Sequence, residues 1–469
     1  MKITPLSGFP ELLPAQRFVE LSVLDELRRT FELHGFAPIE TRAAEPMDQL
    51  LRKGEIDKEV YVLRRLHAAA TDGDSGLGLH FDLTVPFARY VLENAGKLDF
   101  PFRRYQIQKV WRGERPQEGR YREFTQADID VIARDVLPFH HDVEVARVMA
   151  EALSRLEFVP PLRLQVNNRK LIEGFYLGLG ATDIPAVMRA IDKLDKVPAA
   201  VVSKALIDEA GLSQAQTVSC LALAGIHTSD SSFVARVREL GVEHELLDEG
   251  LAELAAVIDG CAALSGERFR VEADLRIARG LDYYTGTVFE TRMAGFESLG
   301  SICSGGRYDS LATDGRTSYP GVGISLGVTR MLLPLFGRGG LTASRSVPST
   351  VLVAVADEES RPISDAIAQQ LRARGIPTEV APSAQKYGKQ IRYAERRGIP
   401  FVWFPAATEV AAGDAGDASA DSNGSGDEVK DIRTGDQVAA DPASWTPPAQ
   451  DLHPQVISTE GNAVIEGQS

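Results

Sequence analysis

The most informative stretch of the chain is FRRYQIQKVWRGERPQEGRYREFTQADIDV, residues 102–131. Strand-like segments at 102–112 and 122–133 lie on either side of a polar, Gly- and Pro-containing tip, which predicts an antiparallel hairpin. Residues 102–122 carry seven Arg or Lys against two Glu. Arginine binds phosphate oxygens through paired hydrogen bonds, so the hairpin is a candidate phosphate-binding surface. A solvated, charged hairpin is the alternative interpretation.

The second strand of this hairpin has a polar face. A two-residue period places Phe124, Gln126, Asp128 and Asp130 on one side of the strand. An amide and two carboxylates on one face do not fit a dry core, because buried polar groups need partners. This face therefore lines either open solvent or a polar binding site.

Composition places the chain among ordinary globular proteins. It has 469 residues, of which 44% are hydrophobic and 25% charged, with a net charge of −15. No apolar run approaches the ~20 residues of a membrane helix, and the N-terminus lacks the apolar stretch of a signal peptide. We therefore expect a cytoplasmic protein that does not bind membranes. The cysteines, Cys220, Cys261 and Cys303, are widely spaced, which argues against a disulfide framework and against a cysteine zinc site.

The changes in composition and apolar periodicity along the chain predict two domains. An amphipathic helix is expected at 16–35, and strand and helix alternate after about residue 349, as in small α/β domains. Residues 411–428 contain no apolar side chain larger than Ala, so we expect a disordered acidic loop there. The expected divisions are a first domain at 1–336 with a helical insertion at about 169–266, a linker at 337–348, an α/β domain at 349–445 and a loose tail at 446–469.

Two further segments carry residue types suited to chemistry. ARGLDYYTGTVFE (278–290) gathers Arg279, Tyr283 and Tyr284 around a turn, and GVGISLGVTR (321–330) reads as a strand entering a helix. Glycines in the latter would let a flat ligand approach the backbone, although tight packing is an equally simple reason for them. LGSICSGGRYD (299–309) is interpreted as a glycine-rich turn.

Together these segments resemble a known enzyme family. The RGER hairpin and GVGISLGVTR resemble motifs 2 and 3 of class II aminoacyl-tRNA synthetases. RGLDYYTGTVFE and SGGRYD are similar to the signature segments of histidyl-tRNA synthetases, as is LHFDLTVPFARY (79–90). The resemblance implies an α+β fold, in which helices flank an antiparallel sheet with a helical insertion. It also implies a C-terminal α/β anticodon-binding domain and a homodimer.

The resemblance implies that histidine and ATP form histidyl-adenylate, whose histidyl group then passes to the 3′ end of histidine tRNA. ATP is a substrate, with Mg²⁺ bound through its phosphates. The implied catalytic residues are Arg112 and Arg279. The implied ATP-binding residues are Arg112, Glu114, Arg120, Phe124, Gly323, Gly327 and Arg330. The implied histidine-binding residues are Asp82, Leu83, Thr84, Arg112, Gln126, Asp130, Arg279, Tyr283 and Tyr284.

Other positions concern tRNA, metal and departures from the family pattern. Contacts to tRNA are expected from a basic helix face and from the hairpin tip, that is, from Lys386, Lys389, Arg392, Arg396 and Gln117. No protein metal site is expected, because the adjacent His140 and His141 cannot point the same way. Arg42 stands where motif 1 usually has proline, and His80 stands where the family often has arginine.

A second function is compatible with the same fold. Synthetase-like regulatory subunits of ATP phosphoribosyltransferase resemble the catalytic domain but lack the anticodon-binding domain. The predicted C-terminal α/β domain and the full set of arginines favour the enzyme. A synthetase for another amino acid does not fit RGLDYYTGTVFE.

Overall fold

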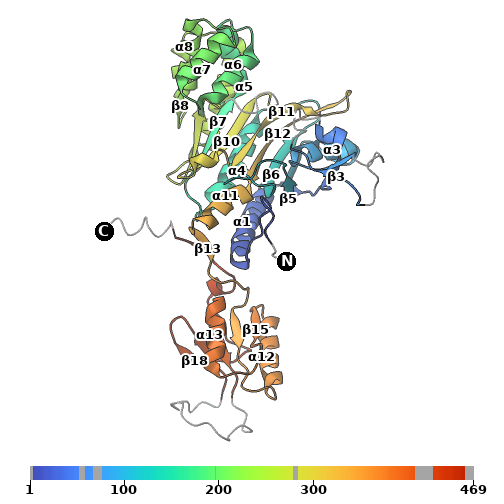
Figure 1. Cartoon of the computed structure of the whole chain (residues 1–469), viewed down its shortest axis with the longest axis vertical. Coiled ribbons are helices and arrows are strands. Elements are labelled where there is room, and N and C mark those ends of the chain that lie inside the picture. The colour runs from blue at the N-terminus through green and yellow to red at the C-terminus, as the bar shows by residue number, and fades with distance from the viewer. Residues whose placement is uncertain are drawn as a thin grey trace, which may run out of the picture. The chain divides into compact units, whose positions relative to one another are not determined.

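The computed structural model describes residues 4–51, 59–66, 76–195, 197–277, 284–406 and 426–459. Contacts divide the chain into two compact units, one of residues 1–11 and 23–337 and the other of residues 12–22 and 338–469. Figure 1 labels the elements of both units. None of the helices in these described ranges is long and apolar enough to span a membrane.

The first unit is built on a nine-stranded sheet with the order β1-β5-β6-β12-β11-β10-β7-β9-β8. The strands are β1 (Ala37–Pro38), β5 (Phe102–Trp111), β6 (Glu123–Ile132), β7 (Leu162–Asn168), β8 (His227–Thr228), β9 (Phe269–Asp274), β10 (Thr287–Met293), β11 (Cys303–Thr313) and β12 (Ser318–Gly327). The predicted hairpin is β5 and β6, paired from Phe102↔Ile132 to Trp111↔Glu123. Neighbours are antiparallel except β1 with β5 and β7 with β9, which are parallel. The predicted fold of a largely antiparallel sheet flanked by helices is confirmed.

Helices cover this sheet with apolar faces at helical spacing. They are α1 (Pro14–Leu33), α3 (Thr84–Asn94), α4 (His140–Ser154) and α11 (Val328–Gly337), whereas the short α2 (Met47–Leu50) packs against α3 and a separate small sheet. In α1, Val23, Leu27 and Phe31 are fully buried, as the amphipathic pattern predicts. Phe87 of α3 packs into a core cluster with Tyr308 and other side chains of the sheet. A small sheet of β2 (Ala44–Pro46), β3 (Val62–Leu63) and β4 (Leu77–Leu79) precedes α3.

Residues 169–261 are mainly helical. The helices are α5 (Arg169–Gly178), α6 (Ile184–Ile191), α7 (Ala199–Asp208), α8 (Gln214–Ala224), α9 (Phe233–Arg238) and α10 (Glu245–Cys261). Helices α5 and α10 approach each other closely at two glycines. A Cβ added at Gly174 would lie 2.2 Å from the Leu247 nitrogen, and one at Gly250 would lie 2.1 Å from the Leu171 nitrogen. Any side chain at either position would push the two helices apart.

The second unit contains a five-stranded sheet with the order β15-β14-β16-β17-β18. Its elements are β14 (Val351–Val353), α12 (Arg361–Ala373), β15 (Thr378–Val380), α13 (Tyr387–Arg397), β16 (Phe401–Phe404), β17 (Glu428–Asp431) and β18 (Gln437–Ala439). The first three strands are parallel and the last two are antiparallel additions. Residues 411–425 of the predicted acidic loop lie outside the described residues, and Glu428 begins β17.

The structure differs from the sequence interpretation in two places. The segment interpreted as a glycine-rich turn, residues 299–309, is mostly strand β11. A Cβ at Gly305 would lie 2.1 Å from the Gly323 carbonyl oxygen, so this glycine allows β11 and β12 to pack closely. In place of a linker and a loose tail, β13 (Leu341–Ala343) pairs antiparallel with β19 (Val456–Ser458). Short strands paired across so many residues leave little local signal in a sequence.

Candidate active site

The site is built around β6, an interior strand of the nine-stranded sheet that lies between β5 and β12. Gln126, Asp128 and Asp130 share one face of this strand, and their partners on β12 are Gly327, Ser325 and Gly323. The pairing with glycine leaves space above the sheet. A Cβ at Gly323 would lie 2.1 Å from Asp130 Oδ1, so any larger residue would displace that carboxylate.

One cavity, of about 520 Å³, is lined by the hairpin and by the start of α11. Its lining residues are Arg112, Glu114, Gly119, Arg120, Tyr121, Phe124, Gln126, Ser301, Ile302, Ser304, Gly327 and Arg330. We call this the cationic cavity, because three guanidinium groups face one carboxylate there. Glu114 Oε1 lies 3.7 Å from Arg112 Nη1, and Glu114 Oε2 lies 3.5 Å from Arg120 Nη1. Burial lowers the pKa of Arg330, and the neighbouring Arg120 and Arg112 lower it further, so an anion would relieve their repulsion.

Arg112 is held in place from behind. Its Nε donates a hydrogen bond to the Phe81 carbonyl oxygen at 3.0 Å, and its guanidinium lies 5.2 Å from the centre of the Phe124 ring. Arg330 donates to the Leu299 carbonyl oxygen. These backbone anchors fix the two cations before any ligand arrives, which is what electrostatic preorganisation requires.

A second cavity, of about 470 Å³, adjoins the first and shares Arg112, Gln126 and Ser304 with it. Its lining residues are Asp82, Thr84, Arg112, Gln126, Asp128, Asp130, Tyr284, Ser304, Gly305, Gly306, Tyr308, Gly323, Ile324 and Ser325. We call it the acidic cavity. Asp82 Oδ1 accepts a hydrogen bond from the Val85 amide at 3.1 Å, which fixes the carboxylate beside the start of α3.

Asp130 is anchored from two sides. Arg104 lies with its Nη2 2.6 Å from Asp130 Oδ2, and the Tyr308 hydroxyl donates to Asp130 Oδ1 at 2.8 Å. Arg104 is fully buried, and its guanidinium lies 4.3 Å from the Phe87 ring centre. Both contacts favour the ionised carboxylate, so Asp130 is a hydrogen-bond acceptor.

The pKa values of Tyr284 and Asp128 are strongly shifted from their ordinary values. Burial raises the pKa of Tyr284, and the carboxylates of Asp130 and Asp82 raise it further, so its hydroxyl stays neutral. Burial also raises the pKa of Asp128, to about 7, although the nearby Arg104 opposes this shift. Such perturbed groups in one cavity mark a functional site.

The structure brings most of the predicted residues together. Arg112, Glu114, Arg120, Phe124, Gly327 and Arg330 line the cationic cavity, and Asp82, Thr84, Arg112, Gln126, Asp130, Tyr284 and Gly323 line the acidic cavity. Leu83 is fully buried at the start of α3 and is not among the lining residues. Arg279 and Tyr283 lie outside the described residues.

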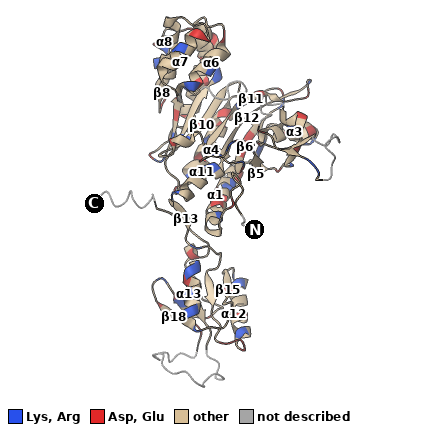
Figure 2. Cartoon of the chain, viewed as in Figure 1, with Lys and Arg blue, Asp and Glu red and all other residues tan. Residues whose placement is uncertain are grey.

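The predicted tRNA-contacting residues lie elsewhere. Gln117 is exposed at the hairpin tip, where its backbone N–H donates a hydrogen bond to the Arg120 carbonyl oxygen. In the second unit, Lys386, at the N-cap of α13, is exposed, as are Lys389, Arg392 and Arg396 along that helix. The opposite face of α13 is buried through Gln390 and Ala394. Figure 2 shows Lys and Arg along this helix.

Sequence reasoning missed several residues of the site. Arg104 was not distinguished from the other basic residues of the hairpin, because only the register of the folded strands places it opposite Asp130. Tyr308 belongs to the segment interpreted as a turn, and Tyr121, Ser301 and Ser304 gave no signal of their own.

The two departures from the family pattern have partners. Arg42 contacts Glu45 and Glu93 at 3.3 and 3.4 Å. His80 is fully buried, stacks on Trp111 and donates from Nε2 to the Lys109 carbonyl oxygen at 2.7 Å. Burial lowers the pKa of His80, which keeps the ring neutral. In the described residues, no group of three or more His, Cys, Asp or Glu could hold a metal ion.

Comparisons with known proteins agree with this geometry. The family model "Histidyl-tRNA synthetase" matches residues 8–331, and "Anticodon binding domain" matches residues 350–415. The chain is 60% identical to the "Histidine--tRNA ligase" of Cutibacterium acnes, covering 98% of this chain and 99% of that one. It is 58% identical to that of Micrococcus luteus, covering 97% and 98%. A crystal structure of histidyl-tRNA synthetase from Nostoc sp. PCC 7120 matches with a TM-score of 0.80 and 33% identity, covering both chains completely.

Proposed function

The chain belongs to the histidyl-tRNA synthetase family, and we infer that it activates L-histidine with ATP and transfers the histidyl group to histidine tRNA. Activation joins the histidine carboxylate to the α-phosphate and releases pyrophosphate. Transfer to the 3′ end of the tRNA then releases AMP. The observation that carries this proposal is the pair of adjoining cavities of opposite charge that share Arg112.

The cationic cavity suits the triphosphate. Arg112, Arg120 and Arg330 together outweigh the charge of Glu114, and guanidinium groups bind phosphate oxygens in pairs. The Phe124 ring offers a flat surface for the adenine, with Glu114 on the same side. ATP enters as its magnesium complex, in which the phosphates bind the ion; among the described residues, Glu114 is the one carboxylate that lines this cavity.

The chemical step needs cations more than it needs a base. The attacking carboxylate is already ionised, but it must approach a negatively charged phosphate. Arg112 lines both cavities, so its guanidinium can contact the carboxylate and the α-phosphate together. Arg279 would supply a second cation from the opposite side, a role that rests on its place in RGLDYYTGTVFE.

The acidic cavity suits the amino acid. Asp130 can accept the hydrogen bond of an imidazole N–H, and the neutral Tyr284 hydroxyl can serve the other ring nitrogen. Asp82, Thr84 and Gln126 surround the space left for the amino group. An amino acid without these nitrogens would leave buried polar groups unpaired, which allows discrimination of about 10⁴–10⁵ without editing.

The exposed basic face of α13 is proposed to contact tRNA phosphates. Phosphate contacts position the tRNA and add affinity but carry little sequence information. Gln117, at the tip of the hairpin, is proposed to contact the acceptor end. We further propose that the enzyme is a cytoplasmic homodimer, because the first helix and the following segment resemble the dimerisation motif of the family.

The regulatory-subunit alternative has weaker support. The histidine--tRNA ligase of Cutibacterium acnes matches 98% of this chain at 60% identity, and the anticodon-binding family matches residues 350–415. A non-enzymatic binding module would also have no use for the three cations of the first cavity.

Histidine-dependent ATP–pyrophosphate exchange tests the proposal. We expect exchange with L-histidine and none above background with the other nineteen amino acids, followed by charging of histidine tRNA. Binding of histidine without exchange would instead support a regulatory module. Exchange driven by another amino acid would overturn the assignment of the acidic cavity.

A further inference from the structure

Asp128 is a buried carboxylate that the proposed mechanism does not use. It lies on β6 between Gln126 and Asp130, lines the acidic cavity and is 3% exposed. In the described part of the chain, its Oδ1 has no hydrogen-bond partner of ordinary geometry, although the Ser325 hydroxyl on β12 lies near enough to oppose the rise in the pKa of this carboxyl. Natural proteins rarely bury a carboxylate oxygen without one, because the lost hydration costs free energy. Such an oxygen, on a residue that lines a cavity, is a candidate contact for a ligand.

A second acceptor beside it is also unsatisfied. Among the residues that the structure describes, Gln126 Oε1 is buried and has no hydrogen-bond partner, and Gln126 lines both cavities. Gln126 and Asp128 are two residues apart on one face of the strand, so their side chains point the same way. A ligand with several hydrogen-bond donors could satisfy both of these acceptor oxygens.

The amino acid offers one such group. A neutral imidazole carries a single N–H, and the anchored carboxylate of Asp130 can accept it. An α-ammonium group carries three N–H donors and a positive charge. A carboxylate that faces an ammonium also forms a charge-assisted hydrogen bond, which is stronger than a neutral one.

The net charge of the cavity supports the same ligand group. Three carboxylates line it, those of Asp82, Asp128 and Asp130, and the buried Arg104 compensates one of them. A cationic group bound beside Asp128 would offset part of this negative charge. Arg112 then remains for the carboxylate of the amino acid.

We propose that Asp128 is a further substrate-binding residue, whose Oδ1 accepts a hydrogen bond from the α-ammonium group of the bound amino acid. This proposal rests on the proposed function, since it takes the acidic cavity as the histidine site. It assigns Asp128 to substrate binding and not to the support of the fold.

Direct binding measurements on the full-length protein test this assignment. The ligands are L-histidine, L-histidinol, which lacks the carboxylate, and imidazole-4-propionate, which lacks the amine. In Asp128→Asn we expect the Kd of the two amines to rise roughly 10- to 100-fold, the scale of a hydrogen bond to a charged group. The Kd of imidazole-4-propionate and the KM for ATP should stay within about twofold of wild type.

Controls separate binding from folding. Asp274→Asn removes another buried carboxylate from the same sheet, one that accepts from Gln165 at 2.7 Å, and should leave all three Kd values unchanged. Asp128→Ser removes the same charge with a smaller side chain, and melting temperatures check that each variant is folded. Both Asp128 variants should lose affinity for the amines.

The outcomes are distinct. An equal loss for all three ligands would place Asp128 against the imidazole and overturn the proposal, and so would unchanged affinity for all three in a folded variant. If the wild-type protein neither binds histidine nor catalyses exchange, the proposed function itself fails. That result differs from a failure at Asp128 alone, where wild-type activity remains.

A pH series adds a readout that a structural role would not change. Asp128 must be ionised to bind an ammonium group, and burial raises its pKa to about 7. The titratable groups that face it are Arg104, Asp130, Asp82, Tyr284 and Cys303. Affinity for histidinol should therefore rise more steeply between pH 6 and 8 in wild type than in Asp128→Asn. Parallel pH profiles would contradict the proposal.

Discussion

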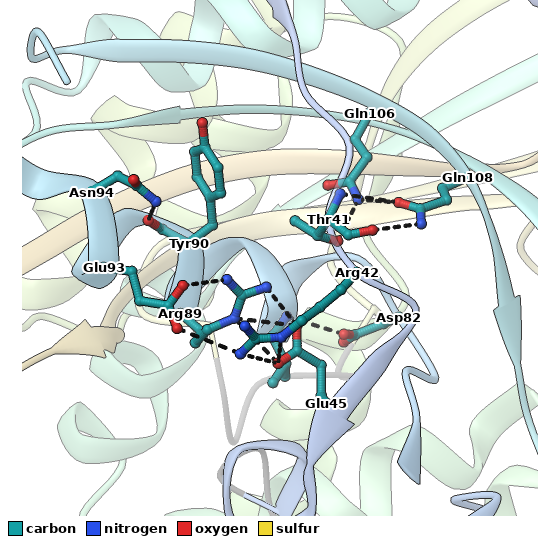
Figure 3. A network of polar contacts seen from close by, with 11 residues as sticks. Thr41, Arg42, Glu45, Asp82, Arg89, Tyr90, Glu93, Asn94, Gln106 and Gln108 are labelled. Atoms are coloured by element: carbon teal, nitrogen blue, oxygen red, sulfur yellow. Dashed lines mark hydrogen bonds and ion pairs between the residues drawn. The ribbon is translucent and has the colours of Figure 1, made fainter. Parts of the chain in front are cut away.

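Arg89 joins the small N-terminal sheet to the helix that begins beside the acidic cavity. Its Nη2 lies 2.6 Å from Glu45 Oε1, its Nε lies 3.2 Å from both Glu45 oxygens, and its Nη1 lies 2.7 Å from Glu93. Glu45 is on β2 and Arg89 is on α3, so the ion pair joins these two elements. Figure 3 shows this network with Asp82 close by.

Replacing Arg89 with Leu should be strongly destabilising. The Glu45 side chain is 1% exposed, and among the described residues its remaining ion-pair partner without Arg89 is the half-exposed Arg42, at 3.3 Å. Removing one partner of a buried ion pair costs about 3–5 kcal/mol, because an uncompensated charge remains. Glu93 is 48% exposed, so Glu93→Gln should cost less than about 1 kcal/mol.

Urea unfolding of a single-tryptophan protein would measure these costs. In a Trp403→Phe/Trp445→Phe background, the remaining tryptophan is Trp111 of β5, which reports on the first unit. The double variant Arg89→Leu/Glu45→Leu should recover most of the loss, since neither charge is then buried.

The same experiment can refute this reasoning. A cost below about 1 kcal/mol for Arg89→Leu, or a double variant no more stable than the single one, would mean that the pair is not a buried anchor. The KM for histidine should also rise in Arg89→Leu, because Asp82 lies between the joined segments. An unchanged KM would separate this network from the site.

Three further predictions concern the site and the tRNA surface. Tyr308→Phe removes a donor to Asp130 and should raise the KM for histidine roughly tenfold, with an unchanged KM for ATP; equal changes in both would point to general distortion. Since the folded-state pKa of Asp128 is raised to about 7, native protein binds more protons than unfolded protein between about pH 4 and 7, so stability should fall as pH rises through that window. In Asp128→Asn this pH-dependent loss of unfolding free energy, on the order of 4 kcal/mol by pH 8, should be absent. Identical curves of unfolding free energy against pH for wild type and Asp128→Asn would contradict this prediction. The triple variant Lys389→Ala/Arg392→Ala/Arg396→Ala should raise the KM for tRNA but leave pyrophosphate exchange unchanged, whereas a loss of exchange would show that α13 affects the adenylation site.

The sequence predicted the parts of the site that depend on local pattern. Alternation along β6 placed Gln126, Asp128 and Asp130 on one face, and the structure has them lining one cavity. Arg104 could not be singled out, because its partner is on another strand and only the register joins them. Nor did composition distinguish the glycines of β11 from turn glycines; close packing against β12 explains Gly305.

Long-range pairing was the other limit. Strands β13 and β19 are three residues each, and neither carries a strand pattern that stands out from its surroundings. Their pairing is a property of the folded chain, in which Leu341 meets Ser458. Local propensity is a weak guide for such short elements, because tertiary contacts decide them.

Arg112 is the residue on which the account depends, since both cavities share it. The most direct test is histidine-dependent ATP–pyrophosphate exchange by Arg112→Ala, with Arg115→Ala as the matched control. Arg115 is an exposed arginine of the same hairpin that lines neither cavity. We predict a fall of about 10²–10³ in kcat/KM for Arg112→Ala and a change of less than about twofold for Arg115→Ala. Near-normal exchange by a folded Arg112→Ala protein would contradict the assignment of the two cavities to ATP and histidine.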